Sequence, residues 1–153
     1  MRSKKARYHK GATLYNANTE LISEEGIYDI DRDFAKFKGK VTIKDSSSVL
    51  RTDSLDYDLA KDEVYLIAPT NMDTDSTSIY CERGYYSYKA EQGRFYKNLQ
   101  ILTGSKTILA DWVDYYAKEK RYVLTGHSLV KDDKSEARAD TIVYFDNEDR
   151  VEL

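Results

Sequence analysis

The sequence predicts an all-β protein made of stacked copies of a 29-residue unit. Three observations predict it: a repeat that aligns without gaps, a composition that favours strands, and short alternating apolar segments separated by polar turns. The 153 residues include 14 Tyr, against 4 Phe, 1 Trp and 1 Pro. Tyr and the β-branched residues suit a pleated, half-buried surface, so strands are expected along the whole chain.

The repeat begins five times, at residues 21, 50, 79, 108 and 137. Its first position is apolar, its third is small, its fourth is acidic and its eighth is Tyr. The acids are Glu24, Asp53, Glu82, Asp111 and Asp140, and the tyrosines are Tyr28, Tyr57, Tyr86, Tyr115 and Tyr144. Five tyrosines in register would arise by chance on the order of once in 10⁵ trials. We therefore expect a repeat domain of about five units over residues 21–153, preceded at residues 1–20 by a cap or the tail of an earlier unit.

Each unit reads as two to three short strands. A nine-residue segment ends near the Tyr, a polar turn follows, and an alternating strand comes next, as at residues 64–67. Gly39 and Gly126 share one repeat position and predict a turn or bulge, after which a short strand such as residues 41–43 leads to a polar corner. Helical spacing is absent. One unit cannot bury its apolar face alone, whereas stacking on the next unit does so.

Two departures from the repeat pattern fall in the third unit and in the end of the second unit, just before it. Gly84 stands where other units have Leu55 or Val113, and residues 68–77 are polar where an apolar strand is expected. These departures predict a weaker or wider apolar surface at that level of the stack. The last unit is cut at Leu153, so we also expect an open strand edge that pairs readily with another chain.

Charge and composition exclude several classes of protein. With 24 basic and 27 acidic residues the formal net charge is -3, which gives no reason to expect a nucleic acid partner. No apolar run approaches the roughly 20 residues of a membrane span. The N-terminus lacks the apolar core of a signal peptide, which fits either a cytosolic chain or a piece of a longer secreted precursor. Because the sequence ends inside a repeat, we expect the piece of a precursor. Cys81 is alone and cannot form an intrachain disulfide.

No catalytic residue, metal or cofactor is expected. The acidic column could form a metal ladder, but carboxylates stacked about 4.8 Å apart would repel each other, so solvent or backbone N–H groups are the expected partners. His9, His127 and Cys81 fall one ligand short of a zinc site. No arrangement for nucleophilic catalysis stands out. Trp112 is expected in the core or at the rim of a groove.

The repeat also predicts two apolar walls. Alternation places Leu55, Tyr57, Val113, Tyr115, Ile142 and Tyr144 on one side of successive strands. The facing wall is expected to contain Ile43, Leu66, Ile101, Leu124 and Val130. Such walls could hold a lipid chain, at about 0.8 kcal/mol per buried CH₂. They could equally pack on each other as a closed core, and the residues alone leave both arrangements open.

The unit resembles the repeat of the OstA/LptA-like family of lipopolysaccharide-transport proteins. The shared pattern is an apolar, a small and an acidic residue followed by Tyr, and it is clearest at residues 50–58 and at residues 108–116 with 122–126. The phrases at residues 24–29 and 82–86 are most similar to OstA-like proteins of Bacteroidetes-type bacteria. The resemblance covers roughly residues 20–150.

The resemblance implies an open, twisted β-jellyroll, or β-taco, with an apolar groove along the stack. It implies a periplasmic, non-enzymatic scaffold for lipopolysaccharide transport to, or assembly in, the outer membrane, with the acyl chains of lipid A in the groove. Its implied partners are other OstA-like domains, those of inner-membrane or outer-membrane transport components, joined head to tail by strand pairing, and further copies of this chain. A self-associating structural β-solenoid without a small ligand, and a glycan-binding or glycan-cleaving solenoid, remain alternatives.

Overall fold

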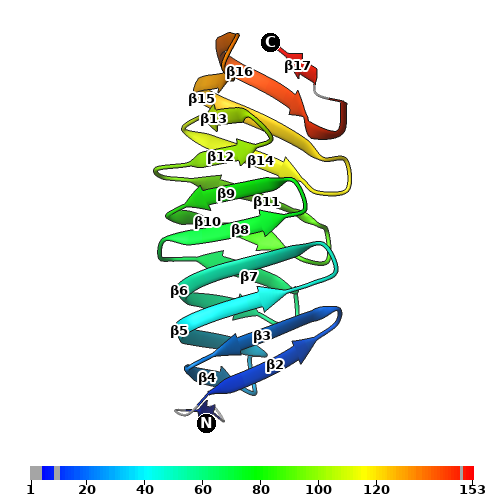
Figure 1. The fold of residues 1–153 in the computed structure, drawn as a ribbon. Coiled ribbons are helices and arrows are strands. Elements are labelled where there is room, and N and C mark those ends of the chain that lie inside the picture. The colour runs from blue at the N-terminus through cyan, green and yellow to red at the C-terminus, as the bar shows by residue number, and fades with distance from the viewer. Residues whose placement is uncertain (1–4, 9–10, 149) are drawn as a thin grey trace.

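The computed structural model describes residues 5–8, 11–148 and 150–153, and every strand in these ranges belongs to one antiparallel sheet. The strands are β1 (Lys5–Tyr8), β2 (Ala12–Asn16), β3 (Thr19–Ser23), β4 (Glu25–Asp29), β5 (Phe34–Lys44), β6 (Ser48–Asp58), β7 (Glu63–Leu66), β8 (Thr70–Thr74), β9 (Thr77–Cys81), β10 (Arg83–Ser87), β11 (Gln92–Tyr96), β12 (Gln100–Thr103), β13 (Lys106–Leu109), β14 (Trp112–Tyr116), β15 (Arg121–Lys131), β16 (Glu136–Phe145) and β17 (Arg150–Glu152). A 3₁₀ turn, η1 (Asp146–Glu148), precedes β17. The fold class predicted from the sequence is confirmed: an all-β, twisted β-jellyroll (Figure 1).

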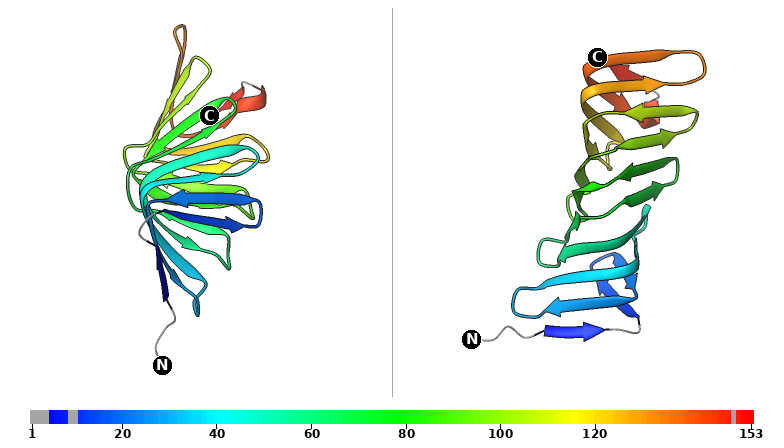
Figure 2. Two further views of the ribbon diagram at one scale, coloured as in Figure 1. Left: turned by 60° about the horizontal axis from the view of Figure 1, so that its bottom comes forward. Right: turned by 90° about the vertical axis from the view of Figure 1, so that its left-hand side faces the viewer.

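The sheet is folded along its length into two facing walls. Wall A contains, in spatial order, β1, β4, the first half of β5, the second half of β6, β7, β10, β11, β14, the first half of β15, the second half of β16 and β17. Wall B contains β2, β3, the second half of β5, the first half of β6, β8, β9, β12, β13, the second half of β15 and the first half of β16. The chain climbs the stack as it passes back and forth between the walls, and the whole stack twists (Figure 2).

The corners between the walls form a spine, and left-handed backbone makes the bends. Gly39 and Lys40 have φ of 85° and 46°, and Gly126 and His127 repeat this pair at 79° and 48°. The strand register shifts at both places, which confirms the predicted bulge. Glycine is needed there because its φ is positive and because a side chain at Gly126 would run into the Asp111 carboxylate.

At the opposite edge of wall A the turns between strands form rim A. Asp33, Asp62, Glu91 and Lys120 occupy equivalent turn positions, each with φ between 48° and 54°. The carbonyl of each accepts a 2.9 Å bond from a backbone N–H in the next turn, from Leu59, Tyr88, Ala117 and Asp146 respectively. The 29-residue spacing of the sequence therefore recurs in the stacking of this rim.

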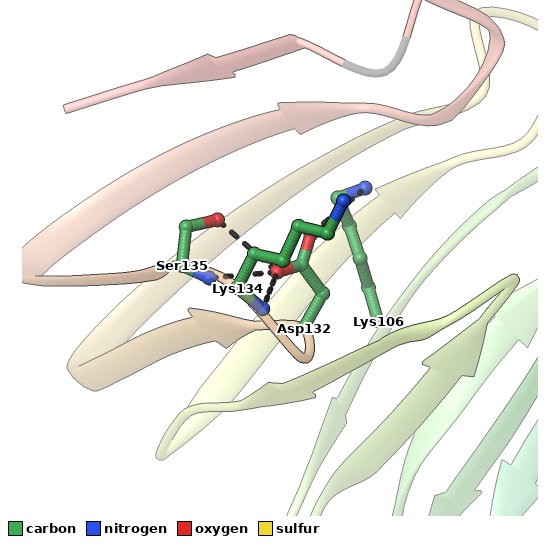
Figure 3. A network of polar contacts seen from close by, with 4 residues as sticks. All are labelled: Lys106, Asp132, Lys134 and Ser135. Carbon is green, nitrogen blue, oxygen red and sulfur yellow. Dashed lines mark hydrogen bonds and ion pairs between the residues drawn. The ribbon is translucent and has the colours of Figure 1, made fainter.

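The turns of wall B form rim B, and two of them share one device. Asp132 Oδ1 accepts backbone N–H bonds from Lys134 and Ser135, both at 2.8 Å, while Lys106 Nζ lies 3.9 Å from Oδ2 (Figure 3). Asp45 does the same with the N–H groups of Ser47 and Ser48. These N–H bonds hold the pKa of Asp132 below its usual value. The aspartates therefore close the long turns of rim B.

The third unit does not contain the weak surface that its sequence predicts. Phe95, opposite Gly84 on the next strand, fills the space that a side chain at Gly84 would take. Tyr86 likewise covers Gly93. The polar segment at residues 68–77 forms β8, which buries Thr70 and Met72. Glycine opposite an aromatic ring thus keeps the interior filled at this level.

This pairing predicts that Gly93→Ala destabilises the protein by about 3 kcal/mol, since the added Cβ would meet the Tyr85 carbonyl and the Tyr86 ring. Gly104→Ala is the matched control. Its Cβ meets nothing within 4 Å, and it should cost about 1 kcal/mol for its positive φ alone. Urea unfolding of both variants measures the difference, and equal losses would contradict the packing argument.

Candidate functional site

All eleven residues predicted to line the two walls lie in one buried core, each between 0% and 4% exposed. Ile43, Ile101 and Val130 belong to wall B, facing the others, as predicted. Leu66 and Leu124 were assigned to the wrong wall: they pair with Leu55 and Val113 within wall A. The error arises because the polar turn after each Tyr returns the chain along the same wall, and the crossing comes only at the next corner.

Sequence reasoning missed about half of the interior. Wall B buries the first residue of successive repeats, namely Leu21, Leu50, Ile79 and Ile108, together with Met72. Wall A adds Val64, Tyr86, Phe95 and Tyr122. The apolar first column of the repeat was a usable signal for wall B. Rings in wall A stack from Tyr86 through Tyr115 and Tyr122 to Tyr144, with centroids 4.9 to 6.4 Å apart.

In this structure the walls pack on each other, and their rims approach along a line that we call the mouth. Two hollows lie in the mouth, of about 150 and 540 Å³. The smaller is lined by Ser47, Ser48, Met72, Thr74, Asp75, Ser76, Tyr86, Glu91, Tyr115, Ala117, Lys120, Tyr122 and Asp146. The larger is lined by Asn16, Ala17, Asn18, Thr19, Asp45, Ser46, Leu59, Ala60, Asp62, Tyr88, Lys89 and Glu91. Both contain residues of both rims.

Among the described residues, hydrogen bonds between side chains join the rims at two places, which we call the seam. Asp146 of rim A accepts bonds from three hydroxyls of rim B: Ser76 at 2.9 Å, Thr77 at 3.1 Å and Thr103 at 2.8 Å. Further along, Asp62 Oδ1 accepts from Asn16 Nδ2 at 3.2 Å. The sequence marked these residues only as polar turns, because pairing across the mouth depends on how far the walls close.

The tyrosine hydroxyls of the interior point toward this polar edge. Tyr57 OH donates to Asp62 at 2.5 Å and lies 3.1 Å from Thr19 Oγ1. Burial raises the pKa of Tyr57 to about 12, and the bond to Asp62 adds to the effect. Burial also raises the pKa of Tyr115 to about 12. These hydroxyls therefore stay neutral and available as donors near pH 7.

A third hollow, of about 470 Å³, lies at the N-terminal end of the interior. Its lining is mostly apolar and consists of Gly11, Ala12, Thr13, Leu14, Gly26, Ile27, Tyr28 and Phe37. Leu14 packs against the core although it is only partly buried. The apolar interior thus continues to the end of the stack.

The acidic column lies on the spine, away from the mouth. Each repeat contributes two strands to each wall, so successive acids are roughly 9.6 Å apart and not the expected 4.8 Å. Asp111 Oδ2 lies 3.0 Å from His127 Nδ1 and raises the pKa of that imidazole, while Glu82 accepts from Asn98. Among the described residues no cluster of His, Cys, Asp or Glu suits a metal ion. His9 lies outside those residues.

Trp112 is neither in the core nor at the mouth, which corrects the expectation from sequence. It lies on the outer face of wall A, 38% exposed, opposite Tyr96. With Tyr85, Arg94, Lys97 and Asp111 these two rings line a shallow outer hollow. The outward direction follows from strand parity, because Trp112 precedes the inward Val113.

No helix in the described part of the chain is long and apolar enough to cross a membrane.

Comparison with known proteins gives two similarities. The family model for OstA-like proteins matches residues 18–111, well over half of the chain. Among solved structures, the chain is similar to LptH, described as the LptA-homologous periplasmic component of the lipopolysaccharide transport device from Pseudomonas aeruginosa. That match has 12% identity and a TM-score of 0.38, and it covers 88% of this chain and 80% of LptH. No curated protein matches significantly.

From the seam we expect Asp146→Ala to weaken the contact between the rims locally. Three hydroxyls of rim B lose their acceptor, so we expect a loss of about 1–3 kcal/mol in unfolding free energy. Hydrogen exchange should accelerate in the rim B turn at residues 74–77 before it does so in the core strands. Asp75→Ala, in the same turn and exposed, is the control. Equal exchange in the two variants would show that Asp146 does not hold the rims together.

The buried tyrosines predict loss of stability at high pH. Their folded pKa values lie above the unfolded value of about 10, so their stabilisation is full below pH 10 and is lost as pH rises toward about 12. Tyrosinate absorbance should therefore rise in a steep step that coincides with loss of the β-sheet circular dichroism signal. A step that leaves the circular dichroism intact would contradict the burial.

Proposed function

We propose, because this chain belongs to the OstA-like protein family, that it is a periplasmic scaffold for lipopolysaccharide transport and that its interior holds the acyl chains. The walls would part at the mouth, the acyl chains would lie along the eleven interior residues predicted from the sequence, and the sugars would remain in water. The chain would act as a carrier surface and not as a catalyst.

The observation that carries this proposal is the way in which the interior is closed. Backbone ladders run along each wall and across the spine, whereas the described residues of the two rims meet through side-chain hydrogen bonds such as those of Asp62 and Asp146. The mouth can therefore open without breaking a strand pair. An entering acyl chain would replace contacts between the walls with contacts to itself, so the apolar surface would stay out of water.

The ends of the stack support pairing with other domains of the same fold. Within the described residues, β2 pairs only with β3, and the first half of β16 pairs only with β15. Leu14 of β2 occupies the same repeat position as Ile43, Met72 and Ile101, so an equivalent strand of another domain would extend wall B in register. We propose head-to-tail pairing at these edges, either with other OstA-like domains or with copies of this chain.

A second candidate is a structural solenoid that associates through these edges and binds no lipid. The closed interior favours it, since the predicted groove residues are at most 4% exposed. The two candidates differ in one property, which is whether the mouth must open for the protein to act.

Cross-linking the mouth tests the proposal directly. Ser76 and Asp146 face each other across the seam, with 2.9 Å between Oγ and Oδ2. In the double variant Ser76→Cys/Asp146→Cys, a short bifunctional thiol reagent should close the mouth. Native mass spectrometry with added lipopolysaccharide should then detect a complex before cross-linking. After cross-linking, the abundance of that complex should fall at least tenfold.

The controls are the two single-cysteine variants treated with the same reagent, which should keep their binding. Cys81 does not interfere, because it is 1% exposed and burial raises its pKa to about 12. Unchanged binding after complete cross-linking would contradict entry through the mouth. No binding by the uncross-linked protein, together with a ladder of oligomers, would favour the structural solenoid.

A further inference from the structure

We propose that the mouth selects amphiphiles with an uncharged, hydroxyl-rich head over those whose head carries phosphate groups. This inference rests on the proposed function, since it concerns the head of a lipid whose chains lie in the interior. It concerns the two mouth hollows, where a head group would lie once the chains are inside.

The charge of the mouth is the first argument. Among the described residues, the two hollows are lined by five carboxylates, from Asp45, Asp62, Asp75, Glu91 and Asp146, and by two cationic side chains, from Lys89 and Lys120. Glu91 lines both hollows, and no Arg in the described part of the chain lines either of them. Phosphate sites in proteins collect Arg, Lys or backbone N–H groups, so this lining repels a phosphate that enters it.

The hydroxyls of the mouth are the second argument, and they are independent of its charge. Ser47, Ser48, Thr74 and Ser76 line the smaller hollow, and Thr19 and Ser46 line the larger one. Several of these hydroxyls already donate within the rims, Ser48 to Asp45 and Ser76 to Asp146, and their oxygens can still accept from the hydroxyls of a sugar or glycerol head. The carboxylates of the mouth can accept hydrogen bonds from the hydroxyls of the same head group.

Tyr88 supplies a third observation that points to a ligand. Tyr88 lines the larger hollow and is only 7% exposed, yet its hydroxyl is buried without a hydrogen-bond partner among the described residues. A buried polar group without a partner costs about 1–3 kcal/mol, and a ligand hydroxyl would remove that cost. Burial holds the pKa of Tyr88 well above its usual value, so the group it offers is a neutral O–H.

The test compares two forms of one lipid. Bisphosphorylated lipid A and its enzymatically dephosphorylated form share the same acyl chains, and their binding to the full chain is measured in detergent at low salt with EDTA. We expect the dephosphorylated form to bind at least tenfold more tightly. The variant Asp75→Asn/Glu91→Gln, which leaves the seam and the turn-closing aspartates Asp45 and Asp132 unchanged, should narrow the difference to about threefold or less.

A matched control separates the mouth from net charge. Asp53→Asn/Asp140→Asn makes the same change of charge on the exposed spine, away from the mouth, and should leave the preference unchanged. Added Mg²⁺ should bridge phosphate and carboxylate and so narrow the preference of the unaltered protein. Circular dichroism confirms that each variant is folded.

The outcomes distinguish this inference from the proposed function. Equal or tighter binding of the bisphosphorylated form in EDTA overturns the selection while leaving lipid binding intact. A spine control that narrows the preference as much as the mouth variant also overturns it, because net charge would then set the preference. If neither form binds, it is the proposed function that fails.

Discussion

Each wall of this sheet has one apolar face, and the other wall is what covers it. This constraint organises the rest of the structure. The walls can cover each other along their whole length only if every strand path bends at the same height, which is why the left-handed corners at Gly39 and Gly126 recur at one repeat position. A bend displaced by one residue would turn the apolar side chains of that strand to the outer face. The spine therefore sets the register of the interior.

The fold could be predicted from the sequence because the same pattern of residues recurs five times, so each unit supports the interpretation of the others. Five tyrosines and five acids in register define the unit, and the glycine bulges follow from their shared position. The assignment of Leu66 and Leu124 failed because alternation tells which face a residue takes but not on which side of a corner its strand lies. Trp112 failed for a related reason: its aromatic character suggested burial, whereas parity with Val113 places it outside.

The closure of the interior could not be predicted from sequence. Apolar side chains that line a groove and apolar side chains that fill a core show the same pattern of residues. What separates the two is the distance between the rims, and this depends on pairs such as Asp146 with Thr103, which are 43 residues apart in the chain. A typical hydrogen bond contributes only about 1 kcal/mol net to stability, so such pairs stabilise the closed interior less than the apolar contacts beneath them do.

Tyr recurs at these positions, although Phe would fill the same space, because each side chain spans the distance from the apolar core to the polar mouth. A ring on the inner face of wall A reaches from the core to the mouth, so its outer end meets polar groups while its body stays dry. Tyr57 shows the arrangement, since it is 0% exposed yet its hydroxyl bonds to Asp62 at the rim. Phenylalanine at these positions would leave Asp62 without one of its donors and would make the edge of the interior apolar. The tyrosine column thus marks the depth at which the apolar interior ends, and it places a row of hydroxyls at the height where the head of a bound amphiphile would begin.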